Sequence, residues 1–516
     1  MSEIQLLPTK DFKTCRGKDE NGNLVEYYAD RILISFDYEE QQFQIAVNDS
    51  SKNGLDVDGL KKSFLEFKSL INRRTKTFVV WVTHLKSLLP IIMEIAPGGV
   101  KVERKNEIKG TQVWVYRTEN FEFRNFDIIS NQTDLAVLKE SYNFPSVSNC
   151  GIMRDYLEMR KGQGFTTWAR LNYSFIYMEN KLFSKGIDSK IVLNSTPTEY
   201  DYNNFMLMCR RGILAIDKTK KGKFISNVYG PDKSSAYPSG FVSLKMPIGR
   251  FYSVSKEERN FTKIKELWEA GERFYVIIRT RKKFDGFFFE LEKDCKKIGE
   301  WYQYVLTDFD LAAALKIYDF NEMGIWLVNI RVSETTDYLP NEIREKVVSL
   351  YNQKQLNKGK NQSAYYNAKT TLDAIWGKAI QNNPYNWKQQ ASKIIKPQWS
   401  LWASSYLHYE IICLAEKIGF ENIVAIDTDG IKTIGDFTSI FEEHNQEIRK
   451  ANKEAGFDSP IGTWDTSEYY EQFIQFEKKV YAEVINGKIE CKFAGCRKPA
   501  WREFYKENGI EKLKEK

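Results

Sequence analysis

Val424-Ala425-Ile426-Asp427-Thr428-Asp429-Gly430-Ile431 is the stretch from which the interpretation of this chain starts. An apolar run ends in two acids one residue apart, and glycine and further apolar residues follow, which predicts two strands joined by a tight turn. Since side chains alternate along a strand, Asp427 and Asp429 are expected on one face. Two such carboxylates favour a hard cation such as Mg²⁺, which takes oxygen ligands. An ordinary polar turn is the alternative, because Asp and Gly are common in turns.

The composition narrows the class of protein. The chain has 516 residues, of which 42% are hydrophobic and 14% aromatic, so we expect several folded domains and no general disorder. A net charge of +7, from 76 basic and 69 acidic residues, fits a polyanionic partner without requiring one. Seven cysteines without a CxxC pair argue against a zinc module, and three histidines argue against a histidine-based metal site. Neither an apolar run of about 18 residues nor a signal-peptide pattern occurs, so we expect a cytoplasmic protein without membrane association.

Hydrophobic periodicity predicts alternating strands and helices along the chain. Residues 1–190 fit a mixed α/β domain, and strands are expected to resume over 205–216. An α/β insert follows at 255–330. A helical pair with a polar loop is predicted over 341–380, and a further helix over 398–419 leads into the acidic hairpin.

A third acid, Asp232, ends a strand-like run and opens a turn rich in Ser, Pro and Gly. Taken alone, it would most simply be a helix N-cap or a turn aspartate. If its strand lies beside the acidic hairpin, three carboxylates can hold two metal ions. Such a pair activates an attacking oxygen and neutralises a leaving pyrophosphate in phosphoryl transfer.

The helix predicted over residues 365–380 has Lys369, Asp373 and Trp376 at i, i+4 and i+7, hence on one face. A lysine on this face suits a triphosphate, and an aromatic residue can stack on a base. Lys354 on the preceding helix could supply a second cation. The alternative is a partly buried amphipathic helix with a solvated lysine.

Basic residues alternate with aromatic residues near the C-terminus, a pattern that suits a nucleic-acid backbone. Lys479 and Tyr481 are expected on one face of a strand, and a second basic cluster occupies 492–498. Arg210-Arg211-Gly212 is a similar short stretch. A solvated strand face is the alternative for each.

The order of these motifs is more specific than any one of them. An Asp-x-x-Ser-x-Tyr-Pro-Ser stretch from Asp232 is followed by the lysine-led helix, the Asp-Thr-Asp hairpin and Lys-x-Tyr. In this order they resemble family-B DNA polymerases, and within them the protein-primed enzymes of bacteriophages and linear plasmids. The resemblance covers most of the chain from about residue 200 onward and, more faintly, residues 30–190.

This resemblance implies a multidomain α/β fold. The expected architecture is a right-hand polymerase with palm, fingers and small thumb, preceded by an RNase H-like domain of the exonuclease type. The implied parts are the exonuclease-like domain, a first palm segment, an insert that docks a priming protein, the fingers, a second palm segment and a short thumb: 1–190, 191–255, 256–335, 336–395, 396–490 and 491–516.

The resemblance also implies roles for single residues. Asp232 and Asp429, supported by Asp427, would bind two Mg²⁺ or Mn²⁺ ions and be catalytic. The incoming dNTP would contact a steric gate that favours deoxyribose and residues of the fingers helices: Tyr237, Lys354, Lys369, Asp373 and Trp376. The DNA primer and template would contact Arg210, Arg211, Gly212, Lys479, Tyr481 and Lys492. The family has Asn and Tyr where this chain has Asp373 and Trp376, and an acid facing a triphosphate is electrostatically unfavourable.

The exonuclease motifs are degenerate. Asp37-Tyr38-Glu39 resembles the first motif, but His84 stands in the second, where Asn and Asp are expected. The third motif should end in Tyr-x-x-x-Asp, and the best candidate, Trp168 to Asn172, ends in Asn. Because two metal ions need three or four carboxylates, we expect this domain to fold without 3′-5′ exonuclease activity.

The expected function is template-directed DNA polymerisation, in which dNTPs are added to a 3′ hydroxyl or a protein hydroxyl by two-metal phosphoryl transfer. If the chain is phage-encoded, it would act in the host cytoplasm. A short stretch between Gly377 and Trp399 and a short C-terminal region after 498 predict low processivity. Two alternatives stay open: a nucleotidyltransferase that makes short or untemplated DNA, for example in phage defence, and a non-catalytic nucleic-acid-binding scaffold.

Overall fold

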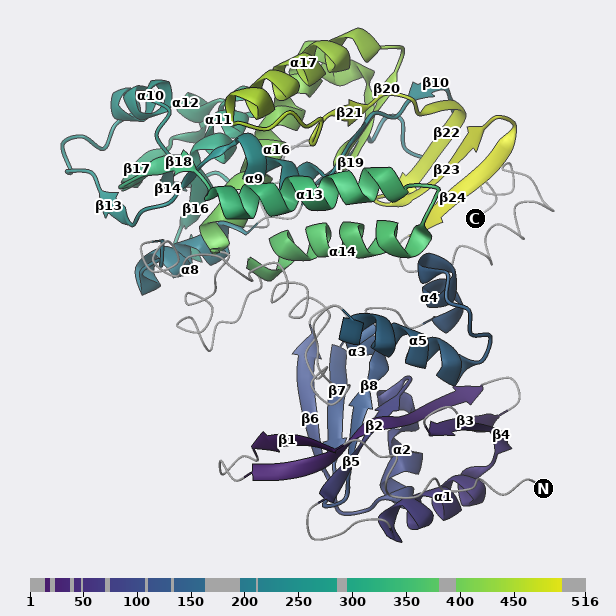
Figure 1. The fold of residues 1–516 in the computed structure, drawn as a ribbon. Helices are drawn as coiled ribbons and strands as arrows, with labels where there is room; N and C mark the ends of the chain where they lie inside the picture. Colours follow the sequence, from purple (N-terminus) through teal and green to yellow (C-terminus); the bar gives the residue numbers. More distant parts are fainter. Residues whose placement is uncertain are drawn as a thin grey trace. The chain divides into compact units, whose positions relative to one another are not determined.

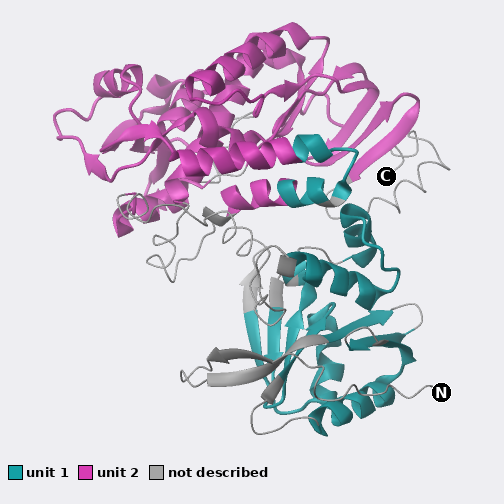
Figure 2. Ribbon diagram, in the orientation of Figure 1, with its two compact units in different colours: residues 1–182, 354–368 teal, residues 183–353, 369–516 magenta. Residues whose placement is uncertain are grey.

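The computed structural model describes residues 14–18, 24–37, 41–47, 50–69, 75–106, 110–130, 134–162, 195–209, 212–284, 295–379 and 396–493. The chain divides into two compact units, which Figure 2 shows in different colours. Unit 1 comprises residues 1–182 and 354–368, and unit 2 comprises residues 183–353 and 369–516. The six-part division implied by the resemblance is finer than these units and stays a prediction.

Unit 1 is built on an eight-stranded sheet of order β4-β3-β2-β5-β8-β7-β6, with β1 paired to β2. The central strands β2 (Leu24–Asp37), β5 (Thr75–Val82) and β8 (Phe121–Asn125) run parallel. Parallel strands are buried on both faces, which explains the continuous apolar run at the end of β5. The remaining strands are β1 (Thr14–Lys18), β3 (Gln42–Val47), β4 (Ser50–Leu55), β6 (Val100–Asn106) and β7 (Gly110–Arg117).

Helices cover both faces of this sheet (Figure 1). α1 (Val57–Ser69) and α2 (Leu85–Ile95) pack on one face and contribute Phe64 and Leu88 to its core. The opposite face, with Trp81, is covered by three helices: α3 (Phe126–Ser130), α4 (Leu135–Tyr142) and α5 (Asn149–Gly162). Each face has its own hydrophobic cluster, because alternate residues of the central strands point to opposite sides.

Unit 2 contains a nine-stranded sheet that joins distant parts of the sequence (Figure 1). Its order is β21-β11-β20-β10-β22-β23-β24, and β19 pairs with both β20 and β9. β19 and β20 form the predicted hairpin, which is thereby confirmed. The strands are β9 (Ile213–Ile216), β10 (Ile225–Tyr229), β11 (Asp232–Lys233), β19 (Ile423–Thr428), β20 (Gly430–Ile434), β21 (Trp464–Asp465), β22 (Tyr469–Glu477), β23 (Val480–Ile485) and β24 (Lys488–Phe493).

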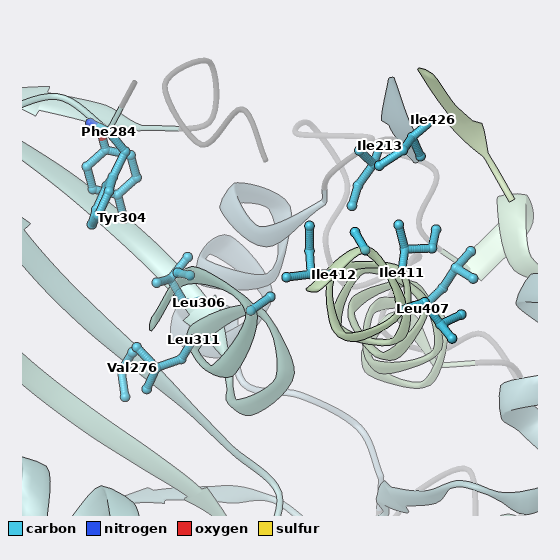
Figure 3. Packing of buried hydrophobic residues seen from close by; sticks show 14 of the residues in the cluster. Ile213, Val276, Phe284, Tyr304, Leu306, Leu311, Leu407, Ile411, Ile412 and Ile426 are labelled. Atoms are coloured by element: carbon cyan, nitrogen blue, oxygen red, sulfur yellow. The ribbon is translucent and has the colours of Figure 1, made fainter. Parts of the chain in front are cut away.

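The predicted helix before the hairpin is α16 (Pro397–Ile418), and it is buried along most of its length. Proline in its first turn and Gly419 after its end fit the usual start and stop signals. Figure 3 shows its apolar side chains between the hairpin region and the insert: Leu407, Ile411 and Ile412 lie between Ile213 and Ile426 on one side and Leu306 and Leu311 on the other. α9 (Ala236–Ser243) and α17 (Thr438–Glu454) also contact α16, and η3 (Phe420–Asn422) follows it.

The insert is a five-stranded antiparallel sheet of order β13-β17-β14-β16-β15 (Figure 1). Its strands are β13 (Phe251–Ser253), β14 (Phe274–Thr280), β15 (Lys296–Ile298), β16 (Trp301–Thr307) and β17 (Trp326–Ser333), and its helices are α10 (Phe261–Glu269), α11 (Asp308–Ile317) and α12 (Phe320–Met323). Two short strands flank the insert in sequence and pair with each other: β12 (Lys245–Pro247) before it and β18 (Thr336–Tyr338) after it. The predicted helical pair is α13 (Asn341–Asn357) and α14 (Gln362–Ala379).

One expectation is wrong: the strand predicted over 205–216 is only β9, because residues up to Met208 belong to the helix α8 (Glu199–Met208). The Thr198 hydroxyl accepts a hydrogen bond from the Asp201 N–H at 3.1 Å, which caps the helix. Glu199 and Asp201 also place negative charge at the helix N-terminus, where it is stabilising. The apolar run after them is too short to distinguish a helix from a strand by its period.

None of the helices in the described ranges combines the length and apolar character needed to cross a lipid bilayer.

Candidate active site

The acidic hairpin reverses at Thr428. Asp427 pairs with Gly430 in the strand register, so Asp429 lies in the turn and not on a strand. Thr428 has a φ of 66°, in the left-handed region, and the Asp429 N–H donates to the Asp427 carbonyl at 2.8 Å. The argument that alternation places both acids on one strand face is therefore wrong, because the chain turns between them.

The sheet places Asp232 directly beside this turn. β11 pairs with β20 through Asp232 and Gly430, and with β21 through Asp232 and Asp465. The Lys233 N–H donates to the Asp429 carbonyl at 2.8 Å. A Cβ atom on Gly430 would lie 3.1 Å from Asp232 Oδ1, so glycine at this position leaves room for the carboxylate. The two acids, far apart in sequence, thus lie on adjacent segments of one sheet.

Asp232 and Asp429 influence each other electrostatically. Desolvation by the surrounding protein, and then the charge of Asp429, raise the pKa of Asp232 to about 7. Desolvation and the charge of Asp427 likewise raise the pKa of Asp429. The Asp232 side chain is nevertheless exposed, so it is open to a ligand from the solvent side. Carboxylates that repel one another in this way favour a bound cation.

The donor set fits a divalent cation held by two protein carboxylates. Mg²⁺ commonly binds one or two carboxylates and completes its shell with substrate phosphates and water. In the part of the chain that the structure describes, no three His, Cys, Asp or Glu side chains form a metal-binding group. The structure sets Asp232 beside the hairpin turn, and the charge of Asp427 acts on Asp429. A metal site formed by all three acids stays a prediction.

Asp427 lies between two lysines for which the resemblance implies contact with the primer. Lys479 Nζ is 3.7 Å from Asp427 Oδ1, and Lys492 Nζ is 3.9 Å from Asp427 Oδ2. Lys492 also lies over the ring of Tyr481, 5.4 Å from its centroid. The three predicted primer-contacting residues Lys479, Tyr481 and Lys492 thus come together beside the hairpin.

Comparisons with known proteins agree with this arrangement at the level of fold. No family model and no curated protein sequence matches the chain. Among solved structures, the Phi29 DNA polymerase complexed with primer-template DNA matches with a TM-score of 0.66 and 13% identity, over 92% of this chain and 94% of that chain. Its complex with primer-template DNA and incoming nucleotide substrates matches with a TM-score of 0.64 over the same shares, also at 13% identity. An orthorhombic crystal form of Phi29 DNA polymerase matches at 13% identity with a TM-score of 0.63, over 96% of this chain and 93% of that chain.

The chain has the fold of Phi29 DNA polymerase. This confirms the multidomain α/β polymerase fold expected from the motif order, although so low an identity shows the fold alone.

Within this Phi29-type fold, Tyr237 lies against both the hairpin turn and the helix α14. Its ring stacks on Trp376, with centroids 4.3 Å apart and an interplanar angle of 23°. Burial and the charge of Asp429 raise its pKa. A Cβ atom on Gly212 would lie 2.7 Å from the Tyr237 hydroxyl and 2.5 Å from Thr428 Cγ2. Gly212 therefore allows β9, the hairpin turn and Tyr237 to approach closely.

Gly212→Ala is expected to lower dNTP incorporation by about tenfold, because the added methyl group must displace Thr428 or Tyr237, and small displacements at a reacting centre have large effects. Single-turnover primer extension measures this, and primer-template affinity should change little. Adding Thr428→Ser removes the closer contact and should restore part of the rate. Full activity of Gly212→Ala alone would contradict the close approach.

The structure describes the positions of three other predicted dNTP-binding residues on α14: Lys369, Asp373 and Trp376. Trp376 Nε1 donates to the Ser404 hydroxyl at 2.5 Å, which fixes α14 against α16. Lys369 and Asp373 are both exposed on α14, and after burial and Asp427, Asp373 adds to the forces that raise the pKa of Asp429. Lys354 belongs to unit 1, and its contact with the dNTP stays a prediction. Arg210 and Arg211 lie outside the described residues.

In unit 1, two of the predicted exonuclease residues lie at the ends of neighbouring parallel strands. Asp37 ends β2 and His84 follows β5, and these strands are neighbours. His84 Nδ1 is 3.1 Å from Asp127 Oδ2. Asp37 lines a cavity of about 280 Å³ whose other polar walls are amides and hydroxyls, from Ser35, Gln42, Gln44, Asn53, Ser148 and Asn149. Glu39 and Asn172 lie outside the described residues, and those described here include no three-residue metal-binding group.

The sequence analysis missed a buried ionic network next to Asp232. Lys233 Nζ is 2.5 Å from Glu410 Oε1, and the two side chains are 3% and 1% exposed. His444 Nε2 lies 2.5 Å from the same oxygen, and Trp464 Nε1 donates to it at 3.4 Å. One carboxylate thus links β11, α16, α17 and β21. A glutamate inside the apolar pattern of α16 was the available signal, because charged residues are rarely buried without a partner.

Stability in the absence of metal should reveal the raised pKa of Asp232. The folded state keeps this proton up to about pH 7, whereas an unfolded chain loses it near about pH 4, so stability falls as pH rises between these values. In EDTA at pH 7.5, Asp232→Asn is therefore expected to raise the Tm by about 2 °C, and the difference should shrink as the pH falls and vanish only below about pH 4. Asp458→Asn, at an exposed loop position, is the control. A lower Tm for Asp232→Asn at pH 7.5 would contradict the assignment.

Proposed function

We propose that this chain is a DNA polymerase that adds dNTPs to a 3′ hydroxyl under the direction of a template. The observation that supports it most is the pairing of β11 with β20, which sets Asp232 beside Asp429 in a chain with the Phi29 DNA polymerase fold. Two mutually repelling carboxylates on adjacent strands, one of them open to solvent, suit phosphoryl transfer with divalent ions.

Asp232 and Asp429 would hold Mg²⁺ or Mn²⁺. When bound, the ions would polarise the attacking oxygen and neutralise phosphate charge, and we propose two of them. Asp427 would orient Lys479 and Lys492, which are 3.7 Å and 3.9 Å from its oxygens, toward the primer backbone. Tyr237, held against Trp376, would limit the space at the sugar and favour deoxyribose.

Primer-template DNA and dNTPs are the proposed partners. The matching Phi29 DNA polymerase structures contain primer-template DNA and incoming nucleotide substrates. We extend this to the present chain because Lys479, Tyr481 and Lys492 place cations and an aromatic ring beside the acids. We also propose that a protein hydroxyl can serve as the primer, with the insert at 256–335 docking the priming protein. This part rests on the resemblance of the motifs.

Primer extension with one dNTP withheld tests the proposed function. On a defined template with Mg²⁺, a template-directed polymerase should stop where the missing nucleotide is first required. Products that continue past this point would identify the untemplated nucleotidyltransferase that the sequence left open. Absence of any product with both Mg²⁺ and Mn²⁺, while primer-template DNA is bound, would support the non-catalytic scaffold and overturn the proposal.

We also expect no 3′-5′ exonuclease activity from unit 1, because the three motifs retain too few carboxylates for two ions. A primer with a labelled, mismatched 3′ end should stay intact with Mg²⁺ and no dNTP. Asp37→Ala is the matched control, since a contaminating nuclease would persist in this variant. Mg²⁺-dependent trimming that Asp37→Ala abolishes would show that the unit is an active exonuclease.

A further inference from the structure

The insert sheet has a face whose character changes along its length. Near its centre, Tyr275, Ile277 and Val305 are buried in a hydrophobic cluster. Further along the same face, Arg279 pairs in register with Gln303 on β16 and with Trp326 on β17. Trp301 lies two residues before Gln303 on β16 and therefore shares the face. The buried half of the face thus continues into an outer half of arginine and tryptophan side chains.

Four of these side chains form a continuous row, which we call the tryptophan–arginine face: Arg279, Trp326, Trp301 and Arg281. Arg279 Cζ lies 5.7 Å from the Trp326 ring centroid. The two indoles are 5.9 Å apart at 63°, and Arg281 Cζ lies 5.1 Å from the Trp301 centroid. Trp326 is 53% exposed and is the only tryptophan among the exposed large hydrophobic residues of the described chain.

The described residues next to this row in sequence are mostly basic. Lys282 and Lys283 follow Arg281 and are exposed. On β15, Lys296 pairs with Gln303 and hence shares the face, and Lys297 is its exposed neighbour. Within the described segments 279–284 and 295–303, Glu300 is the one acid. The connecting residues 285–294 lie outside the described part of the chain and play no role in the argument.

Stacking between arginine and tryptophan can stabilise an exposed sheet end without any partner. This explains why the arginines lie over the indoles, but not why an indole ring with half its surface in water lies among exposed lysines. A guanidinium stacked on a ring keeps its N–H groups for phosphate oxygens. Open aromatic rings with cations around them match the alternating bases and phosphates of a single strand.

We propose that the tryptophan–arginine face binds a single strand of nucleic acid, with a base stacked on Trp326 and the adjacent phosphates contacted by Arg281 and Lys296. A single strand fits better than a duplex, because duplex bases are already stacked on each other and expose only their edges. The proposal goes beyond polymerase activity and does not depend on it, since no residue of the acidic site takes part.

A second-site binding experiment tests the proposal on the full chain. The protein is first saturated with primer-template DNA without dNTP, and a fluorescein-labelled ten-nucleotide oligo(dT) is then titrated by anisotropy. Trp326→Ala should weaken binding of the oligonucleotide by about tenfold, as expected for the loss of one stacked base, whereas Trp326→Phe should retain most of it. Tyr252→Ala, at an exposed aromatic residue on β13 that is 49% exposed, is the matched control and should change nothing.

The salt dependence of oligonucleotide binding tests the contacts of Arg281 and Lys296 with phosphates. Arg281→Gln and Lys296→Gln should each reduce the slope of log affinity against log salt by about one. Wild-type affinity of Trp326→Ala for the oligonucleotide would overturn the proposal. The proposal would also be overturned if the protein bound poly-glutamate and this binding were weakened by Arg281→Gln but not by Trp326→Ala, because the face would then dock an acidic protein.

If a variant does not fold, photo-crosslinking of a 4-thiothymidine oligonucleotide to the wild-type chain tests the proposal. The crosslink should map to the peptide with Trp326 or Trp301, and mapping elsewhere would overturn the proposal.

Discussion

Replacement of Asp429 by alanine is expected to reduce dNTP incorporation by about a thousandfold or more. Asp429 and Asp232 are the two carboxylates that the sheet brings together, so the variant would leave one protein ligand for the metal ions. Loss of several kcal/mol of charge stabilisation in the transition state corresponds to about three powers of ten in rate. Single-turnover primer extension in Mg²⁺ gives the rate.

Binding of primer-template DNA separates this effect from misfolding. Because a carboxyl group offers no attraction to phosphate, removal of Asp429 should not weaken the affinity for a polyanion. Asp458→Ala, at an exposed loop position, should leave incorporation unchanged. Asp427→Ala is expected to have a smaller effect, about tenfold, because this acid contacts Lys479 and Lys492 instead of completing the acidic pair. Incorporation by Asp429→Ala at the wild-type rate would remove both enzyme hypotheses.

The second large effect concerns stability. Glu410→Leu alone is expected to destabilise unit 2 by about 3–5 kcal/mol, because Lys233 is left buried without its carboxylate. Lys233→Met alone should cost less, because Glu410 keeps His444 as a cationic partner. The side chains of Lys233 and Glu410 are only 3% and 1% exposed, so solvent would not screen the remaining charge. Urea unfolding, followed by near-UV circular dichroism, measures the loss.

The double variant Lys233→Met/Glu410→Leu should recover part of this stability, because apolar side chains of similar volume replace both charges, while His444 and Trp464 lose their contacts with Glu410. The hydrogen bond from the Lys233 N–H to the Asp429 carbonyl involves only the main chain and should survive, so incorporation should recover with stability. Lys263→Met, in an ion pair with Glu258 at the surface, is the control and should leave stability unchanged, because solvent screens such pairs. A double variant as unstable as the single ones would show that packing, and not charge compensation, determines the effect.

Local patterns in the sequence predicted many of the elements. The helical pair, the polar loop between α13 and α14, α16 and the acidic hairpin all follow from apolar periodicity and turn residues, and their observed bounds agree within a few residues. The same reasoning failed at α8, where a short apolar run fits two periods and the capping Thr198 decides in favour of a helix. It also failed at Asp429, since a residue in a turn does not follow strand alternation.

By itself, the sequence determined the order of the motifs and hence the polymerase fold, because each motif is a short run whose signals act on neighbouring residues. Only the tertiary structure decided which side chains meet. β11 is two residues long and has no local partner, so the position of Asp232 depends on its pairing with β20 and β21 from the far end of the chain. The contacts of Asp427 with two lysines, of Tyr237 with Trp376 and of Lys233 with Glu410 arise in the same way. Each joins elements far apart in sequence, and their geometry is fixed by the packing of the whole sheet and its helices, which no local pattern encodes.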